Sequence, residues 1–146
     1  MEILQDPRIL ELKNHTNVLH HDNVTLFEHL YGTYQILKEK NKPEYLCMAG
    51  FFHSIYETEY FNFETSYTRE KIKNLIGEQA ENLVYEFCKL DLRINSLISK
   101  SNQWSDQVYA DLLDIELANM AQQGYYNESI KLLEAIRKHL KIEEAA

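Results

Sequence analysis

Residues that interrupt helices are scarce in this sequence. Its 146 residues include only four glycines and two prolines, the residues that most often mark turns and helix ends. No segment alternates polar and apolar residues over the length of a strand, and no internal repeat or low-complexity tract is present. These absences argue against a sheet-based fold and a repeat array, and they predict an all-α protein.

Clusters of positive charge and long apolar runs are also missing. The chain has 15 Lys and Arg residues against 23 Asp and Glu residues, a formal net charge of -8. A negative chain repels nucleic-acid phosphates and anionic lipid headgroups. The segment Met1 to Leu12 carries charges every few positions, unlike a signal peptide, and no stretch reaches the length of a membrane span. We therefore expect no nucleic-acid partner and no membrane partner.

Only two cysteines are present, Cys47 and Cys88. Each lies inside an apolar helical pattern, and neither belongs to a CxxC or a CxxC-HxxH spacing. We expect both to be buried thiols in a reducing compartment, which indicates a cytoplasmic protein.

The length and the hydrophobic content of 45% are those of one globular domain, which we expect to span residues 1–146. A chain of this size buries roughly two-thirds of its unfolded surface on folding. Neither a disulfide nor a structural metal is then needed for stability, so any bound metal would serve chemistry.

Helical periodicity covers most of the chain and predicts about six to seven helices. The expected helices are Pro7 to Asn14, Val24 to Lys40, Pro43 to about Tyr56, Thr68 to Gly77, Glu78 to about Ser96, Ser105 to Gln123 and Asn127 to about Ile142. Thr68, Ser105 and Asn127 are residue types that cap helix N-termini, and Gly77 and Gly124 are typical of helix ends.

Polar residues that the helical period places on apolar faces are the most informative positions. His29 and Thr33 lie one turn apart at the flank of an apolar stripe in the helix that starts at Val24. The helix that starts at Pro43 is apolar nearly all round from Tyr45 on, so His53 should be largely buried. A single histidine on such a helix is more often a hydrogen-bonded core residue than a ligand, so the cluster matters more than either residue alone.

Four acidic or amide side chains in the middle of the helix from Ser105 differ in their expected positions. A turn of about 100° per residue places Glu116 and Asn119 within the buried stripe, and it places Asp111 and Asp114 outside it, facing solvent.

Glu116 has two interpretations. A buried carboxylate costs several kcal/mol unless a cation, a metal or strong hydrogen-bond donors meet it. Glu116 is therefore either part of a functional pocket or the structural partner of an arginine such as Arg93.

Two segments carry specific patterns. Glu28 to Thr33 contains HLxGT, and Ala49 to Thr58 reads AGxFHSxYxT. Together with Ile76 to Phe87 and Ile115 to Asn119, they resemble a largely uncharacterised HD-domain-like family. The resemblance covers roughly residues 21–123 and implies an HD-domain-like helical bundle.

The resemblance also implies a metal site. In the HD superfamily, known for metal-dependent phosphohydrolases and a few di-iron oxygenases, a histidine of one helix and a His-Asp pair of the next bind metal with a later aspartate. His29 and His53 match the two histidines, but Ser54 replaces the aspartate of the pair. Because a serine hydroxyl supplies no bridging charge, this departure argues against a dinuclear centre.

A mononuclear site is the remaining form of this hypothesis, for one divalent transition metal such as Fe, Mn or Zn. Its expected ligands are His21, His29, His53 and Glu116. Tyr56 and Thr33, one turn beyond His53 and His29, are expected to support the ligands or contact the substrate. The alternative role of Glu116 is that of a catalytic base.

Three functions remain open. The first is a small metal-dependent enzyme of HD type that acts on a small molecule. A hydrolase is favoured over an oxygenase. The second is a metal-free enzyme or small-ligand-binding module with the same His/Glu pocket, which the Ser54 replacement favours. The third is a structural or partner-binding helical protein, which an aromatic content of 12% favours. A small-molecule substrate is the expected partner, and a homodimer is left open.

Overall fold

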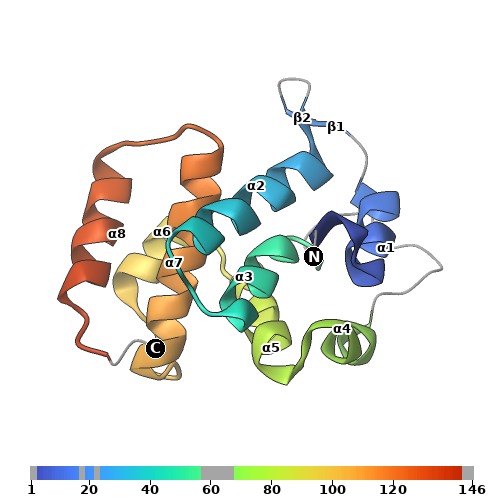
Figure 1. The fold of residues 1–146 in the computed structure, drawn as a ribbon. Coiled ribbons are helices and arrows are strands. Elements are labelled where there is room, and N and C mark those ends of the chain that lie inside the picture. The colour runs from blue at the N-terminus through green and yellow to red at the C-terminus, as the bar shows by residue number, and fades with distance from the viewer. Residues whose placement is uncertain (1–2, 17–18, 22–23, 57–67, 143–146) are drawn as a thin grey trace.

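The structure, a computed structural model, describes residues 3–16, 19–21, 24–56 and 68–142, with residues 15 and 19–21 as backbone only. Eight α-helices lie within these residues (Figure 1). They are α1 (Pro7–Thr16), α2 (Leu26–Glu39), α3 (Glu44–Phe51), α4 (Arg69–Ile76), α5 (Glu78–Cys88), α6 (Arg93–Ser99), α7 (Asp106–Gln122) and α8 (Glu128–His139). A 3-10 turn, Ile3–Gln5, precedes α1. A short antiparallel hairpin of β1 (Leu19–His21) and β2 (Val24–Thr25) precedes α2.

The prediction of an all-α protein is confirmed, but the helix count is eight instead of six to seven. The difference arises mainly between residues 78 and 99, where the sequence predicts one long helix and the structure has two, α5 and α6. Leu92 separates them with a φ of 48°, in the left-handed region. An α-helix cannot continue through such a residue, and no glycine or proline in this segment announces the break.

Helix starts follow the sequence closely. The expected caps Thr68, Ser105 and Asn127 each accept a hydrogen bond from a backbone N–H in the first turn of α4, α7 and α8. Thr25 forms a capping box with Glu28 at the start of α2. These side chains satisfy N–H groups that have no partner within the helix, which is why they mark the starts so well.

The third helix ends earlier than expected. α3 stops at Phe51, and residues 52–56 form a turn instead of the last turn of a helix reaching Tyr56. His53 therefore lies just beyond the helix, where its side chain can reach back to the last turn.

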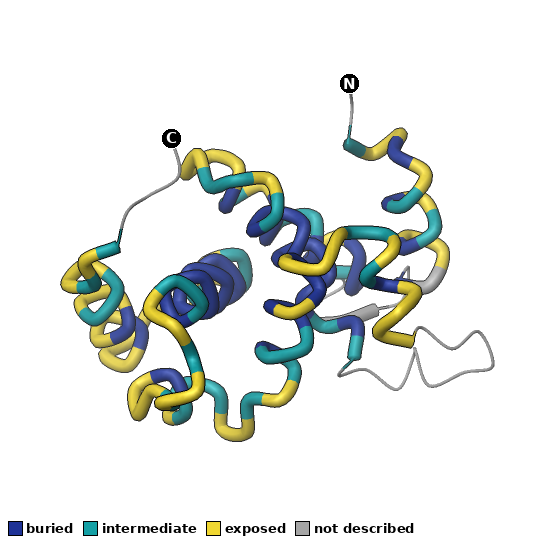
Figure 2. The backbone as a smooth tube through the Cα atoms, turned by 90° about the horizontal axis from the view of Figure 1, so that it is seen from below, coloured by how far each residue is buried: buried dark blue, intermediate teal, exposed yellow. Residues whose placement is uncertain are grey.

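The helix α7 forms the centre of the core. It packs against α2, α3, α5, α6 and α8, and Figure 2 shows its tube in dark blue over most of its length, ringed by helices with yellow outer turns. Every residue from Tyr109 to Glu116 is buried. α7 therefore has no solvent-facing stripe in this part.

The prediction that Asp111 and Asp114 face solvent is wrong, because α7 is covered on all sides there. Their exposed fractions are 3% and 8%. Asp111 accepts hydrogen bonds from the Tyr45 hydroxyl at 2.8 Å and from Gln107 at 2.9 Å, and burial raises the pKa of its carboxyl. Both carboxylates thus belong to the interior of the bundle.

Asp114 joins three parts of the chain. It receives two hydrogen bonds from the guanidinium of Arg137 in α8, at 2.9 and 3.2 Å. Lys42 lies between α2 and α3, and its Nζ atom is 3.2 Å from Oδ2 of Asp114. The carboxylate therefore ties α8 and the α2–α3 connection to the central helix.

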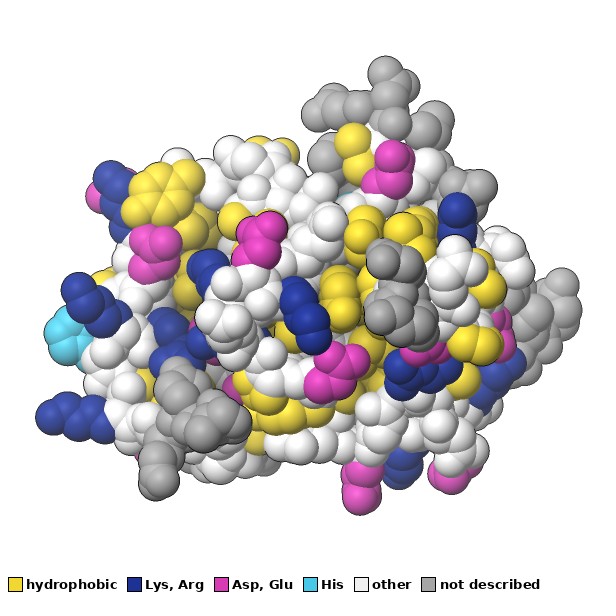
Figure 3. Space-filling model, in the orientation of Figure 1, with side chains coloured by type: hydrophobic (Ala, Val, Ile, Leu, Met, Phe, Trp, Pro, Cys, Tyr) yellow, Lys and Arg dark blue, Asp and Glu magenta, His cyan; other side chains and the backbone are white. Residues whose placement is uncertain are grey.

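The surface carries both signs of charge. On the face drawn in Figure 3, basic and acidic side chains are interspersed and form no basic stripe among the residues described. Within the described part of the chain, no helix combines the length and the apolar character needed to cross a membrane.

Candidate functional site

Two buried histidines from successive helical segments form the centre of the candidate site. His29 lies in α2, His53 lies in the turn after α3, and each is 2% exposed. Their ring centroids are 5.2 Å apart and the rings are nearly perpendicular, at 80°. The expectation that His53 is largely buried is confirmed, and the histidines of the two sequence patterns are in contact.

The ring of His29 is held by the central helix. Its Nδ1 atom is hydrogen-bonded to Oε1 of Gln122, at the end of α7. Gly32 makes this approach possible, because a Cβ atom there would lie 2.6 Å from Cγ of Gln122. The glycine of the HLxGT pattern thus leaves room for the side chain that orients the histidine of the same pattern.

Gly32→Ala should therefore weaken the site. Alanine in place of a helical glycine normally adds about 1 kcal/mol of stability, but here the methyl group overlaps Gln122. We expect a net loss of about 1 to 2 kcal/mol in the free energy of unfolding and displaced NMR signals of the His29 ring. In Gly32→Ala/Gln122→Ala the overlap is gone, so this double variant should be more stable than Gly32→Ala alone. A single Gly32→Ala variant more stable than the parent would contradict the close approach.

The ring of His53 is held by the last turn of α3, the helix that precedes it. Its Nδ1 atom lies 2.7 Å from the carbonyl oxygen of Gly50. A side chain at Gly50 would overlap Leu37 of α2, so this glycine lets α2 and α3 pack closely. The AGxFHS pattern therefore combines a close helix contact with the carbonyl that orients the histidine.

His53 is neutral at physiological pH. Burial is the largest cause that lowers its pKa to about 3, and the neighbouring His29 and Arg93 lower it further, against hydrogen bonds with Gly50 and Asn119. Nδ1 of His29 and Nδ1 of His53 both face oxygen atoms, and the neutral ring of His53 donates its Nδ1 hydrogen to the carbonyl of Gly50.

A row of polar side chains leads outward from His53. Asn119 is hydrogen-bonded to the His53 ring and donates from Nδ2 to Oε1 of Glu116 at 3.0 Å. The same carboxylate oxygen lies 3.6 Å from Nη1 of Arg93 in α6. The prediction that Glu116 and Asn119 are buried is confirmed, and Arg93 is the cation that meets the buried carboxylate.

Glu116 and Arg93 form the charged wall of a surface pocket of about 360 Å³ between α6 and α7. Its lining residues are Leu92, Arg93, Ile94, Asn95, Glu116 and Met120. His29 and His53 are not among them and lie behind this wall. A ligand in the pocket would meet Arg93 and Glu116, while His53 is linked to Glu116 through Asn119.

Thr33 and Tyr56 make contacts elsewhere. The Thr33 hydroxyl donates to the backbone carbonyl of His29 at 3.0 Å. The Tyr56 hydroxyl donates at 2.8 Å to Glu81, a fully buried carboxylate that also receives two hydrogen bonds from Arg69. Burial, the largest cause, and Glu81 raise the pKa of Tyr56, so this hydroxyl stays protonated at neutral pH. Catalytic roles for Thr33 and Tyr56 stay predictions, while the contacts present link structural elements.

The described residues supply two imidazoles of a metal site but not a third ligand. In histidines that bind metal, one ring nitrogen is typically held by an oxygen atom, as Nδ1 is in His29 and in His53. Within the described part of the chain, however, no group of three His, Cys, Asp or Glu side chains is placed to hold a metal ion, and Glu116 is met by Arg93. The side chain of His21 lies outside the described residues. The site of four metal ligands therefore stays a prediction, and the described residues supply only two of its ligands side by side, His29 and His53.

Comparison with known proteins identifies a family. A family model described as a domain of unknown function (DUF6817) matches residues 10–92, more than half of the chain. The chain belongs to this family. The DUF6817 match includes His29 and His53 but ends before α6 and α7, which carry Arg93 and Glu116. No curated protein and no solved structure matches the chain, so these comparisons show no link to the HD superfamily.

Sequence reasoning missed Gln122, which orients His29. A signal for it was present, because a glycine inside a helical pattern, such as Gly32, indicates the close approach of another segment. The sequence gives no means of naming that segment, since the partner lies 93 positions away from His29.

Proposed function

We propose that this DUF6817 member binds a small polar molecule in the pocket between α6 and α7, with Arg93 and Glu116 as its contacts. The observation that supports this function is the position of Glu116, a carboxylate that is 1% exposed and yet lines a pocket. Buried polar groups held in a network beside a cavity are typical of functional sites.

The chemistry of the pocket favours a ligand with both hydrogen-bond donors and acceptors. Arg93 offers a cationic donor and Glu116 an anionic acceptor 3.6 Å apart, while Ile94 and Met120 offer apolar surface. If the ligand is turned over, Glu116 is the group suited to accept a proton, since the low pKa of His53, about 3, makes it a weak base and His53 does not line the pocket.

We also propose a distant relationship to the HD superfamily. His29 from α2, His53 after α3 and an acidic residue, Glu116, from a later helix follow the order of the HD metal ligands. The contact between His29 and His53 supports this relationship. The replacement of the HD aspartate by Ser54 favours the metal-free form of the function, in which the histidines orient side chains.

Ligand screening by NMR tests the proposal. A library of water-soluble polar fragments is added to the labelled chain, and we expect saturable shifts of backbone amides in Leu92–Asn95 and near Glu116. Glu116→Gln keeps the shape of the side chain but removes its charge, and we expect it to weaken binding of the strongest fragment at least tenfold. Glu39→Gln makes the same change at an exposed position of α2 and should leave binding unchanged.

The stability of the unliganded variant separates the two interpretations of Glu116. Arg93 keeps partial access to water, so we expect Glu116→Gln to cost only about 1 kcal/mol. A loss of several kcal/mol with fragment binding intact would assign Glu116 to the structural pairing of Arg93 alone. Fragments that bind only elsewhere on the chain would also overturn the proposal.

A metal-dependent hydrolase or oxygenase of HD type is the second candidate. The contact between the two buried imidazoles, each with Nδ1 held by an oxygen atom, favours it. Elemental analysis of tag-free protein tests it: about one equivalent of Fe, Mn or Zn, lost in both His29→Ala and His53→Ala, would establish this candidate over the metal-free one. Folded protein without a stoichiometric metal would remove it.

A further inference from the structure

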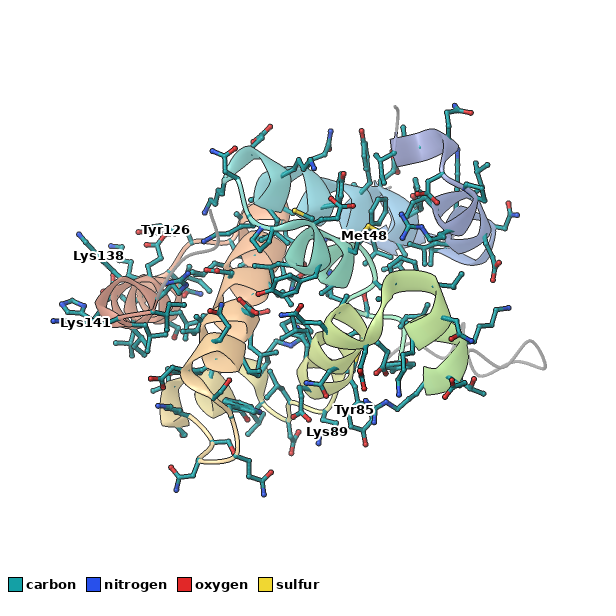
Figure 4. All side chains as sticks on the ribbon, turned by 60° about the horizontal axis from the view of Figure 1, so that its bottom comes forward. Met48, Tyr85, Lys89, Tyr126, Lys138 and Lys141 are labelled. Carbon is teal, nitrogen blue, oxygen red and sulfur yellow. The ribbon has the colours of Figure 1, made fainter. Side chains whose placement is uncertain are left out.

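A second and larger pocket lies on the other side of the first turn of α6. Its volume is about 530 Å³, and it is formed by the end of α5, by α6 and by the connection from α6 to α7. Lys89, one of its lining residues, lies with Tyr85 at the outer edge of α5 in Figure 4. Leu92 and Asn95 line both this pocket and the one that contains Glu116. Among the described residues, no histidine lines it.

The indole of Trp104 lines this pocket and is fixed in place. One of its sides stacks on Tyr109, with centroids 5.9 Å apart and an angle of 17° between the rings. Nε1 donates to Glu86 at 3.3 Å, and the backbone N–H of Trp104 donates to the carbonyl of Ser101 at 3.2 Å. Tyr109 is itself buried and donates its hydroxyl to Leu97. The ring is therefore a rigid flat surface whose position needs no ordering when a ligand binds.

The charges that line the pocket are balanced, with Lys89 and Lys100 against Glu86 and Asp91. Lys89 lies 3.4 Å from Glu86, and Lys100 lies 3.2 Å from Asp106. With a formal net charge of -8 on the whole chain, the pocket does not attract anions. This balance disfavours phosphorylated ligands and favours an uncharged one.

Besides the carboxylate of Asp91, the remaining polar lining consists of hydroxyl and amide groups. They belong to Asn95, Ser96, Ser99, Ser101 and Gln103. Such groups both donate and accept hydrogen bonds, as the hydroxyls of a sugar do. A flat indole beside them matches the apolar C–H face of a sugar ring, and this combination fits an uncharged polyhydroxylated ring better than an apolar ligand.

The backbone at both ends of α6 is strained, and both strained residues line the pocket. Leu92 has a φ of 48° and Lys100 a φ of 58°. The left-handed region is unfavourable for residues with a Cβ atom and costs about 1 to 2 kcal/mol for each. Leu92 is also 73% exposed. Strain of this kind clusters at ligand-binding sites, where the surrounding fold holds it.

We propose that the pocket at Trp104 binds a neutral saccharide, with one sugar ring stacked on the indole and its hydroxyls hydrogen-bonded to the serine and amide side chains of α6 and the α6–α7 connection. This site is separate from the pocket at Glu116, and the proposal does not depend on the function proposed there.

Trp104 is the only tryptophan of the chain, so its fluorescence reports on this pocket alone. The full chain is titrated with N-acetylglucosamine, maltose and cellobiose, with excitation at the red edge where tyrosine does not absorb. We expect a saturable change of intensity or a blue shift with at least one of these sugars. Adenosine and AMP are titrated in parallel and should bind at least tenfold more weakly.

Variants locate the binding. Gln103→Ala and Ser99→Ala, both at exposed lining positions, should weaken binding of the responding sugar at least fivefold. Ser129→Ala, at an exposed position of α8, should not, and neither should Glu116→Gln. Three results would overturn the proposal: no saturable change with any of the sugars, tighter binding of adenosine or AMP, or sugar binding that survives both lining variants. A loss caused by Glu116→Gln alone would place the sugar in the other pocket and overturn it too.

Discussion

Asp114→Ala should lower the free energy of unfolding by about 3 kcal/mol, the largest effect we expect from a single polar side chain of this molecule. The carboxylate neutralises Arg137 and Lys42 together, and these cations are only 15% and 18% exposed. Its removal leaves two largely buried positive charges side by side. Chemical denaturation of the parent and the variant at neutral pH measures the difference.

Asp106→Ala is the matched control, because Asp106 lies on the same helix but its side chain is 62% exposed. Its ion pair with Lys100 is open to solvent, so the expected loss is below about 1 kcal/mol. Equal losses in Asp114→Ala and Asp106→Ala would mean that α8 is not fastened to α7 through Asp114.

Acid should destabilise the parent much more than a variant without His53. In the unfolded chain this imidazole binds a proton below pH 6.5, whereas in the folded chain burial keeps its pKa at about 3. Between these values protons bind preferentially to the unfolded chain. The contribution of His53 to the free energy of unfolding is therefore complete above pH 6.5 and decreases as the pH falls. At about 1.4 kcal/mol per pH unit, the parent should lose about 2 kcal/mol more than His53→Gln between pH 7 and pH 5.

Denaturation curves at pH 7, 6 and 5 measure this dependence. His139→Gln, at an exposed position of α8, provides the control and should follow the parent at each pH. If the free energies of the parent and of His53→Gln instead run parallel with pH, the buried neutral state of His53 is refuted.

The parts of the fold that depend on local chemistry were predictable. Thr68, Ser105 and Asn127 cap the expected helices, and the apolar stripe of α2 is buried, because capping and periodicity act within a few residues. The break at Leu92 was not predictable, since a bulky residue in the left-handed region has no signal in the local sequence.

The candidate site shows the same division. His53, Glu116 and Asn119 could be placed in the interior from periodicity alone. Asp111 and Asp114 could not, because periodicity assumes that a helix keeps one face in water, and α7 is surrounded. Whether a buried acid contacts a metal or an arginine depends on which segment packs opposite it. Arg93 of α6 lies opposite Glu116 because of a backbone turn at Leu92 that the sequence does not indicate.

The central position of α7 has a consequence for how the chain is made. A ribosome releases α2, α3 and α5 well before α7, so the faces of these helices that pack on α7 have nothing to cover them at that stage. The bond between His29 and Gln122 closes a loop of 93 residues, and contacts of such range form late. Native packing should therefore arise in one cooperative step after residue 122 has emerged, and a nascent chain that ends at residue 92, where the family match ends, should still depend on protection from aggregation.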